Sequence, residues 1–237
     1  LKQAEELGDK AGLGLSLISI GVVHHIKGGL DKALDYYKRS LAITEKIGDK
    51  LGMGSSLNNI GFVYLNKGDL DTALDYYKRA LAIQEELGDK RGMGASLMNS
   101  GNVHESKGDY DTALDYYKRA LAIQEKVGDK SRMGSSLNNI GSVYVNKGGL
   151  DKALDYLKRA LAIAEELGDK AGLGLSLNHI GTTHANKGNY KKAENYLEKS
   201  LSIQKEIGLG GELPLWGITY LYLTYKHLGK AYDEKEI

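Results

Sequence analysis

Apolar residues recur along the chain with the three- and four-residue spacing of amphipathic helices. In residues 50–67, Met53, Leu57 and Ile60 follow this spacing, which predicts one helix, called helix A. In residues 70–87 a second stripe of the same kind predicts another, called helix B. Polar residues fill the positions between the stripes, so each helix has one face to bury and one face for solvent.

Glycine and aspartate mark where these helices end and begin. Gly68 follows helix A and Gly48 follows the preceding helix B, where a residue of left-handed conformation commonly closes a helix. Asp49 can accept a hydrogen bond from the free backbone N–H groups that open the next helix A. The pair Gly48 and Asp49 therefore separates two neighbouring helix pairs.

The whole pattern repeats every 40 residues. The triplet Gly-Asp-Lys begins each copy, at Gly8, Gly48, Gly88, Gly128 and Gly168. The stretches between the triplets align without a gap, which gives five units. One helix pair has too small a core to fold alone, so the units are expected to stack on one another.

Small residues repeat where helix A is expected to meet helix B. On helix A they are Gly21, Gly61, Gly101, Gly141 and Gly181, and on helix B they are Ala33, Ala73, Ala113, Ala153 and Ala193. A larger side chain at these positions would push the two helices apart.

Several of these residues resemble the tetratricopeptide repeat signature, in which W-x2-L-G-x2-Y is followed by A-x3-F. Here the matching residues are Leu57, Gly61, Tyr64, Ala73 and Tyr77, and the match recurs in all five units. The chain departs from the 34-residue form, because leucine replaces the usual tryptophan, no proline closes helix B and each unit has six more residues. The longer unit is similar to those of kinesin light chains, Pins-type scaffolds and many bacterial signalling proteins. The resemblance implies an all-α, right-handed superhelical solenoid of antiparallel helix pairs.

The two ends of the chain differ from the regular units. Residues 1–7 align with residues 161–167 and predict the tail of a preceding helix B. Residues 8–207 form the five repeats. Residues 208–237 are expected to form a modified or truncated sixth repeat or a C-terminal cap, in which the register slips by one residue after Gly208.

Composition excludes several classes of function. Lys and Arg total 32 against 31 Asp and Glu, so a net charge of +1 offers no field to attract nucleic acid or an anionic membrane. No apolar run reaches the roughly 18 residues of a membrane helix. The chain has no cysteine, which excludes thiolate chemistry and fits a reducing compartment, so a cytoplasmic location is expected.

The histidines do not form a catalytic or metal-binding pattern. His24, His104 and His184 share one repeat position, which Tyr64 and Tyr144 occupy in the other units. Histidines two units apart are about 20 Å from each other, too far for one zinc ion, so they are interpreted as packing residues. No sequence motif of a hydrolase, metalloprotease or phosphate-binding loop occurs. We expect no enzyme activity, no metal and no cofactor.

Comparing two repeats with each other locates the variable positions. Residues 67–85 and 107–125 differ at one position in nineteen, whereas residues 50–66 and 90–106 differ at eight of seventeen. The family resemblance implies that helix A lines a concave groove, so the differences fall mostly where a ligand would lie. Duplication history of the gene is the alternative explanation. The residues expected to select the ligand are Val22 and His25, Phe62 and Leu65, Asn102 and Glu105, Ser142 and Val145, and Thr182 and Ala185.

Asparagines recur in three rows on helix A although asparagine is a poor helix former. The first row is Asn59, Asn99 and Asn139, the second row is Asn58, Asn138 and Asn178, and the third row is Asn66, Asn146 and Asn186. A side-chain amide donates and accepts hydrogen bonds, so these rows could hold the main chain of an extended peptide of any sequence. The alternative is that the amides tie neighbouring A helices together or are solvated.

These observations predict a non-catalytic scaffold that binds a protein or an extended peptide in the groove of the A helices. The predicted contacts are the three asparagine rows together with Phe62, Leu65, Asn102 and Glu105. The alternative function is structural: self-association through the ends of the array, or a spacer within a larger signalling protein, with no ligand in the groove.

Overall fold

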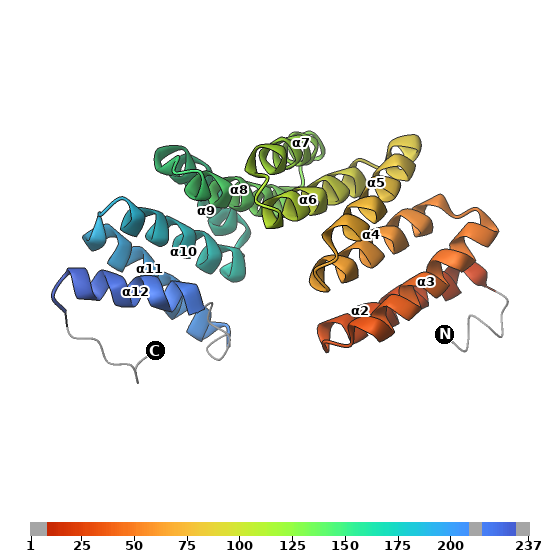
Figure 1. Cartoon of the computed structure of the whole chain (residues 1–237), viewed down its shortest axis with the longest axis horizontal. Helices are drawn as coiled ribbons and strands as arrows, with labels where there is room; N and C mark the ends of the chain where they lie inside the picture. Colours follow the sequence, from red (N-terminus) through yellow and green to blue (C-terminus); the bar gives the residue numbers. More distant parts are fainter. Residues whose placement is uncertain (1–8, 209–214, 231–237) are drawn as a thin grey trace. The chain divides into compact units, whose positions relative to one another are not determined.

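The computed structural model describes residues 9–208 and 215–230, and in the second segment it describes side chains from Gly217 onward. Within these residues all regular structure is helical, and successive helices form antiparallel pairs (Figure 1). The predicted fold class, an all-α solenoid of stacked helix pairs, is confirmed.

Each 40-residue unit contains one A helix and one B helix. The A helices are α2 (Lys10–Ile26), α4 (Lys50–Asn66), α6 (Lys90–Ser106), α8 (Lys130–Asn146), α10 (Lys170–Asn186) and α12 (Leu215–His227). The B helices are α3 (Leu30–Ile47), α5 (Leu70–Leu87), α7 (Tyr110–Val127), α9 (Leu150–Leu167) and α11 (Tyr190–Glu206). None of these helices is both long and apolar enough to span a membrane, among the residues that the structure describes.

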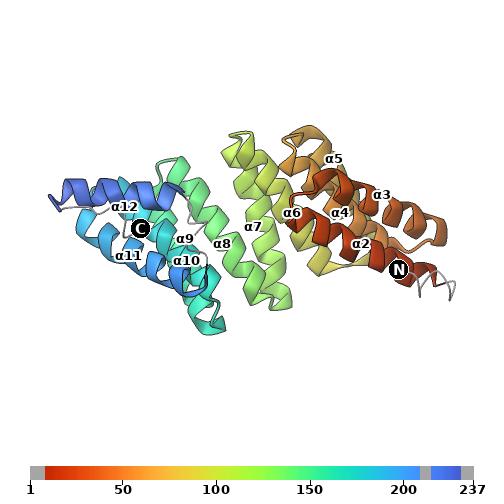
Figure 2. The ribbon, with the colours of Figure 1, turned by 90° about the horizontal axis from the view of Figure 1, so that it is seen from below.

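The contacts divide the chain into two compact units, residues 1–127 and residues 128–237. The N-terminal unit contains α2 to α7, and the C-terminal unit contains α8 to α12. The B helices α3, α5 and α9 each pack against the A helix of their own pair and that of the next pair, and α7 packs against α6. Helix α11 packs against α10 and α12, and α12 lies beside α11 in both views of the ribbon (Figure 1, Figure 2). Helix α12 lies in the segment for which a modified or truncated sixth repeat is expected, and that assignment stays a prediction.

Helix ends follow the predicted capping pattern. Gly48 closes α3 with φ of 70°, in the left-handed region that a residue without Cβ adopts most easily. Asp49 then caps α4, and its Oδ1 accepts from the backbone N–H of Gly52 at 3.0 Å. Helix α4 ends at Asn66, one residue earlier than predicted, because Lys67 is the C-cap before the left-handed Gly68.

On α4 and α6, the glycine at the helix crossing faces a tyrosine ring of the paired B helix. A Cβ at Gly61 would lie 2.7 Å from Cε1 of Tyr77, and one at Gly101 would lie 2.5 Å from Cε1 of Tyr117. Both tyrosines are fully buried. The ring of the B helix thus fills the space that the missing side chain leaves, which confirms the predicted close crossing.

In the N-terminal unit a buried joint connects each pair to the next. Thr44 near the end of α3 lies against the start of α4, where a Cβ at Gly52 would be 2.6 Å from its Cγ2. Gln84 has the same position one unit later, and a Cβ at Gly92 would be 2.9 Å from its Cγ. Each joint is therefore fitted around a different side chain.

Rings stack between the two helices of every pair. His24 stacks on Tyr36 with centroids 5.3 Å apart, and Tyr64 stacks on Tyr76 at 5.6 Å. His104 and His184 make the equivalent contacts with Tyr116 and Tyr196. The interpretation of these histidines as packing residues in place of tyrosine is confirmed.

Two predicted segments lie outside the described residues: the helix B tail at residues 1–7, and the end of the sixth repeat, residues 231–237.

Candidate functional site

Neighbouring A helices contact one another within each compact unit, so their side chains share one face. On this face the first asparagine row is partly exposed, at Asn59 and Asn99 in the N-terminal unit and at Asn139 in the C-terminal unit. Within the described residues neither Asn59 nor Asn99 makes a side-chain hydrogen bond. Their amides are therefore available to a ligand.

The second asparagine row makes contacts between A helices. The hydroxyl of Ser96 donates to Oδ1 of Asn58 at 2.9 Å and so connects α6 to α4. The hydroxyl of Ser176 donates to Oδ1 of Asn138 at 3.1 Å and connects α10 to α8. Asn138 is only 4% exposed. These contacts are those of the helix-tying alternative, and peptide binding by this row stays a prediction.

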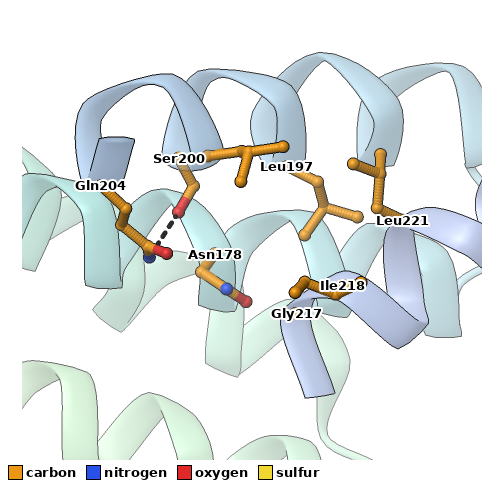
Figure 3. Close-up of a pocket in the computed structure, with 8 residues that line it drawn as sticks. Asn178, Leu197, Ser200, Gln204, Gly217, Ile218 and Leu221 are labelled. Atoms are coloured by element: carbon orange, nitrogen blue, oxygen red, sulfur yellow. Dashed lines mark hydrogen bonds between the residues drawn. The ribbon is translucent and has the colours of Figure 1, made fainter. Parts of the chain in front are cut away.

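Asn178, the third member of that row, belongs to α10 and is buried against α11 and α12 (Figure 3). Its Oδ1 has no hydrogen-bond partner within the described residues. The reason is that the next A helix has Gly217 where earlier units have serine, once the one-residue slip is counted. A Cβ at Gly217 would lie 2.3 Å from Nδ2 of Asn178, so α12 approaches the amide closely.

The third asparagine row is exposed at Asn66, Asn146 and Asn186. In the N-terminal unit Nδ2 of Asn66 lies 2.8 Å from Nε2 of His25, so this amide bridges α4 to α2. Phe62 lies on the same imidazole, with ring centroids 4.8 Å apart and planes 8° from parallel. Phe62 is nevertheless 41% exposed, which leaves its outer face for a ligand.

Two of the predicted selecting residues meet a buried tyrosine. The hydroxyl of Tyr117 lies 2.7 Å from Oε2 of Glu105 and 2.7 Å from Oδ1 of Asn102. Burial, and then the negative charge of Glu105, raise the pKa of Tyr117. One unit earlier, Phe62 and Leu65 replace these acceptors, and the hydroxyl of Tyr77 is buried with no partner within the described residues. Leu65 itself packs against the Tyr77 cluster.

The C-terminal end of the face contains two residues that the sequence analysis did not select. His179 occupies the first-row position in α10, since it lies 40 residues after Asn139. Tyr220 occupies the same position in α12 when the slip is counted. Both line a cavity of about 210 Å³ together with Ser142, Val145, Asn146, Thr182 and Asn186. Burial lowers the pKa of His179 to about 4, so its imidazole is neutral at pH 7.

The described part of the chain contains no group of three or more histidine or acidic side chains that could hold a metal ion. Three lysines that follow A helices form ion pairs with the B helix of the preceding pair. Lys67 Nζ lies 2.5 Å from Oδ1 of Asp31, and a hydrogen bond and charge attraction from the lysine lower the pKa of that carboxyl. Lys107 and Lys187 pair with Asp71 and Asp151 in the same way.

The model of the tetratricopeptide repeat family matches the chain at residues 52–126 and 132–206. These segments cover more than half of the 237 residues. No curated protein sequence matches the chain.

Several solved structures have the same fold. BtubC (BKLC) from P. vanneervenii is 23% identical with a TM-score of 0.76, and the alignment covers 87% of each chain. The sensor-containing STAND protein PH0952 from Pyrococcus horikoshii is 20% identical with a TM-score of 0.77; 90% of this chain aligns with only 32% of that one. A kinesin light chain-like protein with TPR-like repeats from Podosopora anserina is 17% identical with a TM-score of 0.66. The alignment covers 81% of this chain and 95% of that one. These likenesses concern the fold.

Proposed function

The chain belongs to the tetratricopeptide repeat family, and from this membership we propose that it is a non-catalytic scaffold that binds an extended protein or peptide segment along its A helices. Repeats of this family commonly mediate protein binding. The observation that carries the proposal is the first asparagine row, because Asn59 and Asn99 are partly exposed and form no side-chain hydrogen bond within the described residues. A buried joint would not leave amides in this state.

In the proposed complex the first row holds the main chain of the ligand, because an amide can satisfy both a peptide N–H and a peptide C=O. Packed helices lie about 10 Å apart, so each unit would meet roughly three residues of an extended chain at about 3.3 Å per residue. Phe62 and Leu65 provide an apolar subsite in α4, whereas Asn102 and Glu105 provide a polar, acidic one in α6. These side chains would determine which ligand is preferred.

The test is a display library of extended peptides, followed by titration of a selected binder against the wild-type chain and the Asn59→Ala/Asn99→Ala variant. We expect the variant to lose about 1–3 kcal/mol of binding free energy with every binder, at about 0.5–1.5 kcal/mol per hydrogen bond. Thermal unfolding should be unchanged. Full-strength binding by the variant would contradict the proposal.

The alternative function is self-association with no ligand in the groove, and sedimentation at increasing concentration, with no saturable binder in the library, would favour it. We also propose a cytoplasmic location, which suits a chain without cysteine.

A further inference from the structure

Two of the spaces between neighbouring A helices lie at equivalent positions, 120 residues apart in the sequence. In the first space, between α2 and α4, the ring of Phe62 lies on His25 at 4.8 Å and Asn66 bonds to the same imidazole. The chain thus fills this space with an aromatic ring of its own.

In the second space, between α8 and α10, the aromatic ring is missing. Thr182 stands at the position of Phe62, and Val145 stands at the position of His25. Asn186 is retained at the position of Asn66. A cavity of about 210 Å³ lies here, and Tyr220 from α12 also lines it.

The chemistry of the walls restricts what the cavity can hold. Val145 and the ring of Tyr220 are apolar, while Ser142, Asn146 and Asn186 supply hydroxyl and amide groups. Among the described residues, no Asp, Glu, Lys or Arg lines the cavity. A charged side chain entering it would lose hydration without gaining an opposite charge, which is unfavourable.

The size of the cavity restricts the ligand further. At about 210 Å³ it is smaller than the roughly 300–1,000 Å³ of pockets for drug-sized ligands, and it suits a single large side chain. A tyrosine side chain combines an apolar ring with a hydroxyl that donates and accepts, which matches the mixed walls.

We propose that this cavity receives an uncharged aromatic side chain, tyrosine foremost, from the peptide bound along the A helices, in the place that Phe62 fills at the other end. The proposal rests on the proposed function and names the ligand side chain that the C-terminal end of the groove selects. The neutral state of His179, whose pKa burial lowers, agrees with it.

The first experiment uses N-acetyl-tyrosinamide as the probe and follows the backbone amide signals of the 237-residue chain by NMR. We expect saturable shifts at His179 and Tyr220 and none at Phe62. N-acetyl-lysinamide and N-acetyl-aspartamide with a free side-chain carboxylate should bind about tenfold more weakly or not at all. Equal affinity for the charged probes, or no saturable shift with tyrosinamide, would overturn the proposal.

Variants locate the binding. Thr182→Phe copies the ring of Phe62 into the cavity and should abolish the shifts at Tyr220. Because Thr182 is buried, this variant could fold poorly. Asn186→Asp, at an exposed position, is therefore the second test and should weaken binding of the tyrosinamide probe several-fold. The matched control Asn195→Asp makes the same exchange at an exposed position on α11, outside the predicted contacts, and should leave the affinity unchanged.

The peptide library separates this proposal from the proposed function. Binders that carry tyrosine or phenylalanine at one fixed position, and lose that preference with Asn186→Asp, support both. Binders without such a position leave the scaffold function intact and contradict the aromatic subsite. If the library yields no binder but tyrosinamide binds at the cavity, the cavity is confirmed as an aromatic site and the peptide scaffold is contradicted.

Discussion

The hydroxyl of the buried Tyr117 donates a hydrogen bond to the carboxylate of Glu105 across 2.7 Å, and so links the inside of a helix pair to the face of the A helices. A hydroxyl has one proton and cannot also donate to Asn102. When the hydroxyl donates to the carboxylate, the Asn102 amide can rotate and donate its NH₂ to the tyrosine oxygen. Asn102 and Glu105, the predicted selecting residues of α6, are thereby held in place by a residue of α7.

This contact predicts different effects for two matched tyrosine variants. Tyr117→Phe should lower the free energy of unfolding by about 1–2 kcal/mol, because it removes a hydrogen bond to a carboxylate that is partly exposed. Tyr77→Phe removes a hydroxyl that has no partner within the described residues, so stability should stay the same or rise. Urea unfolding of both variants measures the difference; equal losses would mean that Glu105 does not hold Tyr117.

The two adjacent asparagine rows are expected to differ in stability. Asn138→Ala leaves the fully buried hydroxyl of Ser176 without its acceptor and should cost about 1–3 kcal/mol. Asn59→Ala should be neutral or slightly stabilising, because alanine is the better helix former. Chemical denaturation of the two variants tests this, and a large loss from Asn59→Ala would make that residue a structural tie as well.

Two glycines of α6 give a matched test of the close helix crossing. Gly101→Ala puts a Cβ 2.5 Å from the ring of Tyr117 and should cost about 1–3 kcal/mol. Gly94→Ala meets only ordinary contacts, the nearest at 3.6 Å from Gln124, and should stabilise by about 0.5–1 kcal/mol. Thermal melts of the pair compare them, and a gain from Gly101→Ala would show that α6 and α7 do not cross at this glycine.

Acid should destabilise the C-terminal unit through His179. Its pKa is lowered to about 4 by burial, below the roughly 6.5 of an unfolded histidine, so the fold prefers the neutral imidazole. Stability is unaffected above pH 6.5 and falls as the pH drops towards 4, by up to about 3 kcal/mol.

His179→Asn restores the first-row asparagine and serves as the comparison. His184, whose pKa burial also lowers, is present in both proteins and cancels in the difference. Denaturation at pH 7 and pH 4.5 should show a smaller acid loss for the variant. Parallel losses in the two proteins would show that His179 does not carry this effect.

The helices were predictable because their signals are local. The apolar spacing predicted the two types of helix. Gly48 with Asp49 predicted the boundary between α3 and α4 to within one residue, since capping depends on neighbours in the chain.

Residues 60 and 100 show the limit of comparing repeats. Ile60 and Ser100 differ, yet both are buried, so this difference belongs to the core rather than to the groove.

The candidate site was less predictable because its contacts join residues far apart in sequence. The bond from Ser96 to Asn58 spans 38 positions, and no pattern within one helix reveals it. His179 could have been found by continuing the row from Asn139 by 40 residues. Tyr220 could not be found in this way, because the 40-residue spacing no longer applies after the one-residue slip.

The joints between pairs limit how the repeats could be rearranged. The start of α4 has Gly52, and Thr44 fills the space beside it. The corresponding residue of α8 is Arg132. A reordered gene that joined the α8 repeat directly to α3 would force the first atom of that arginine side chain into the space of Thr44. Near-identical repeats therefore cannot be exchanged freely, because the fit at each joint depends on the order in which the gene encodes them.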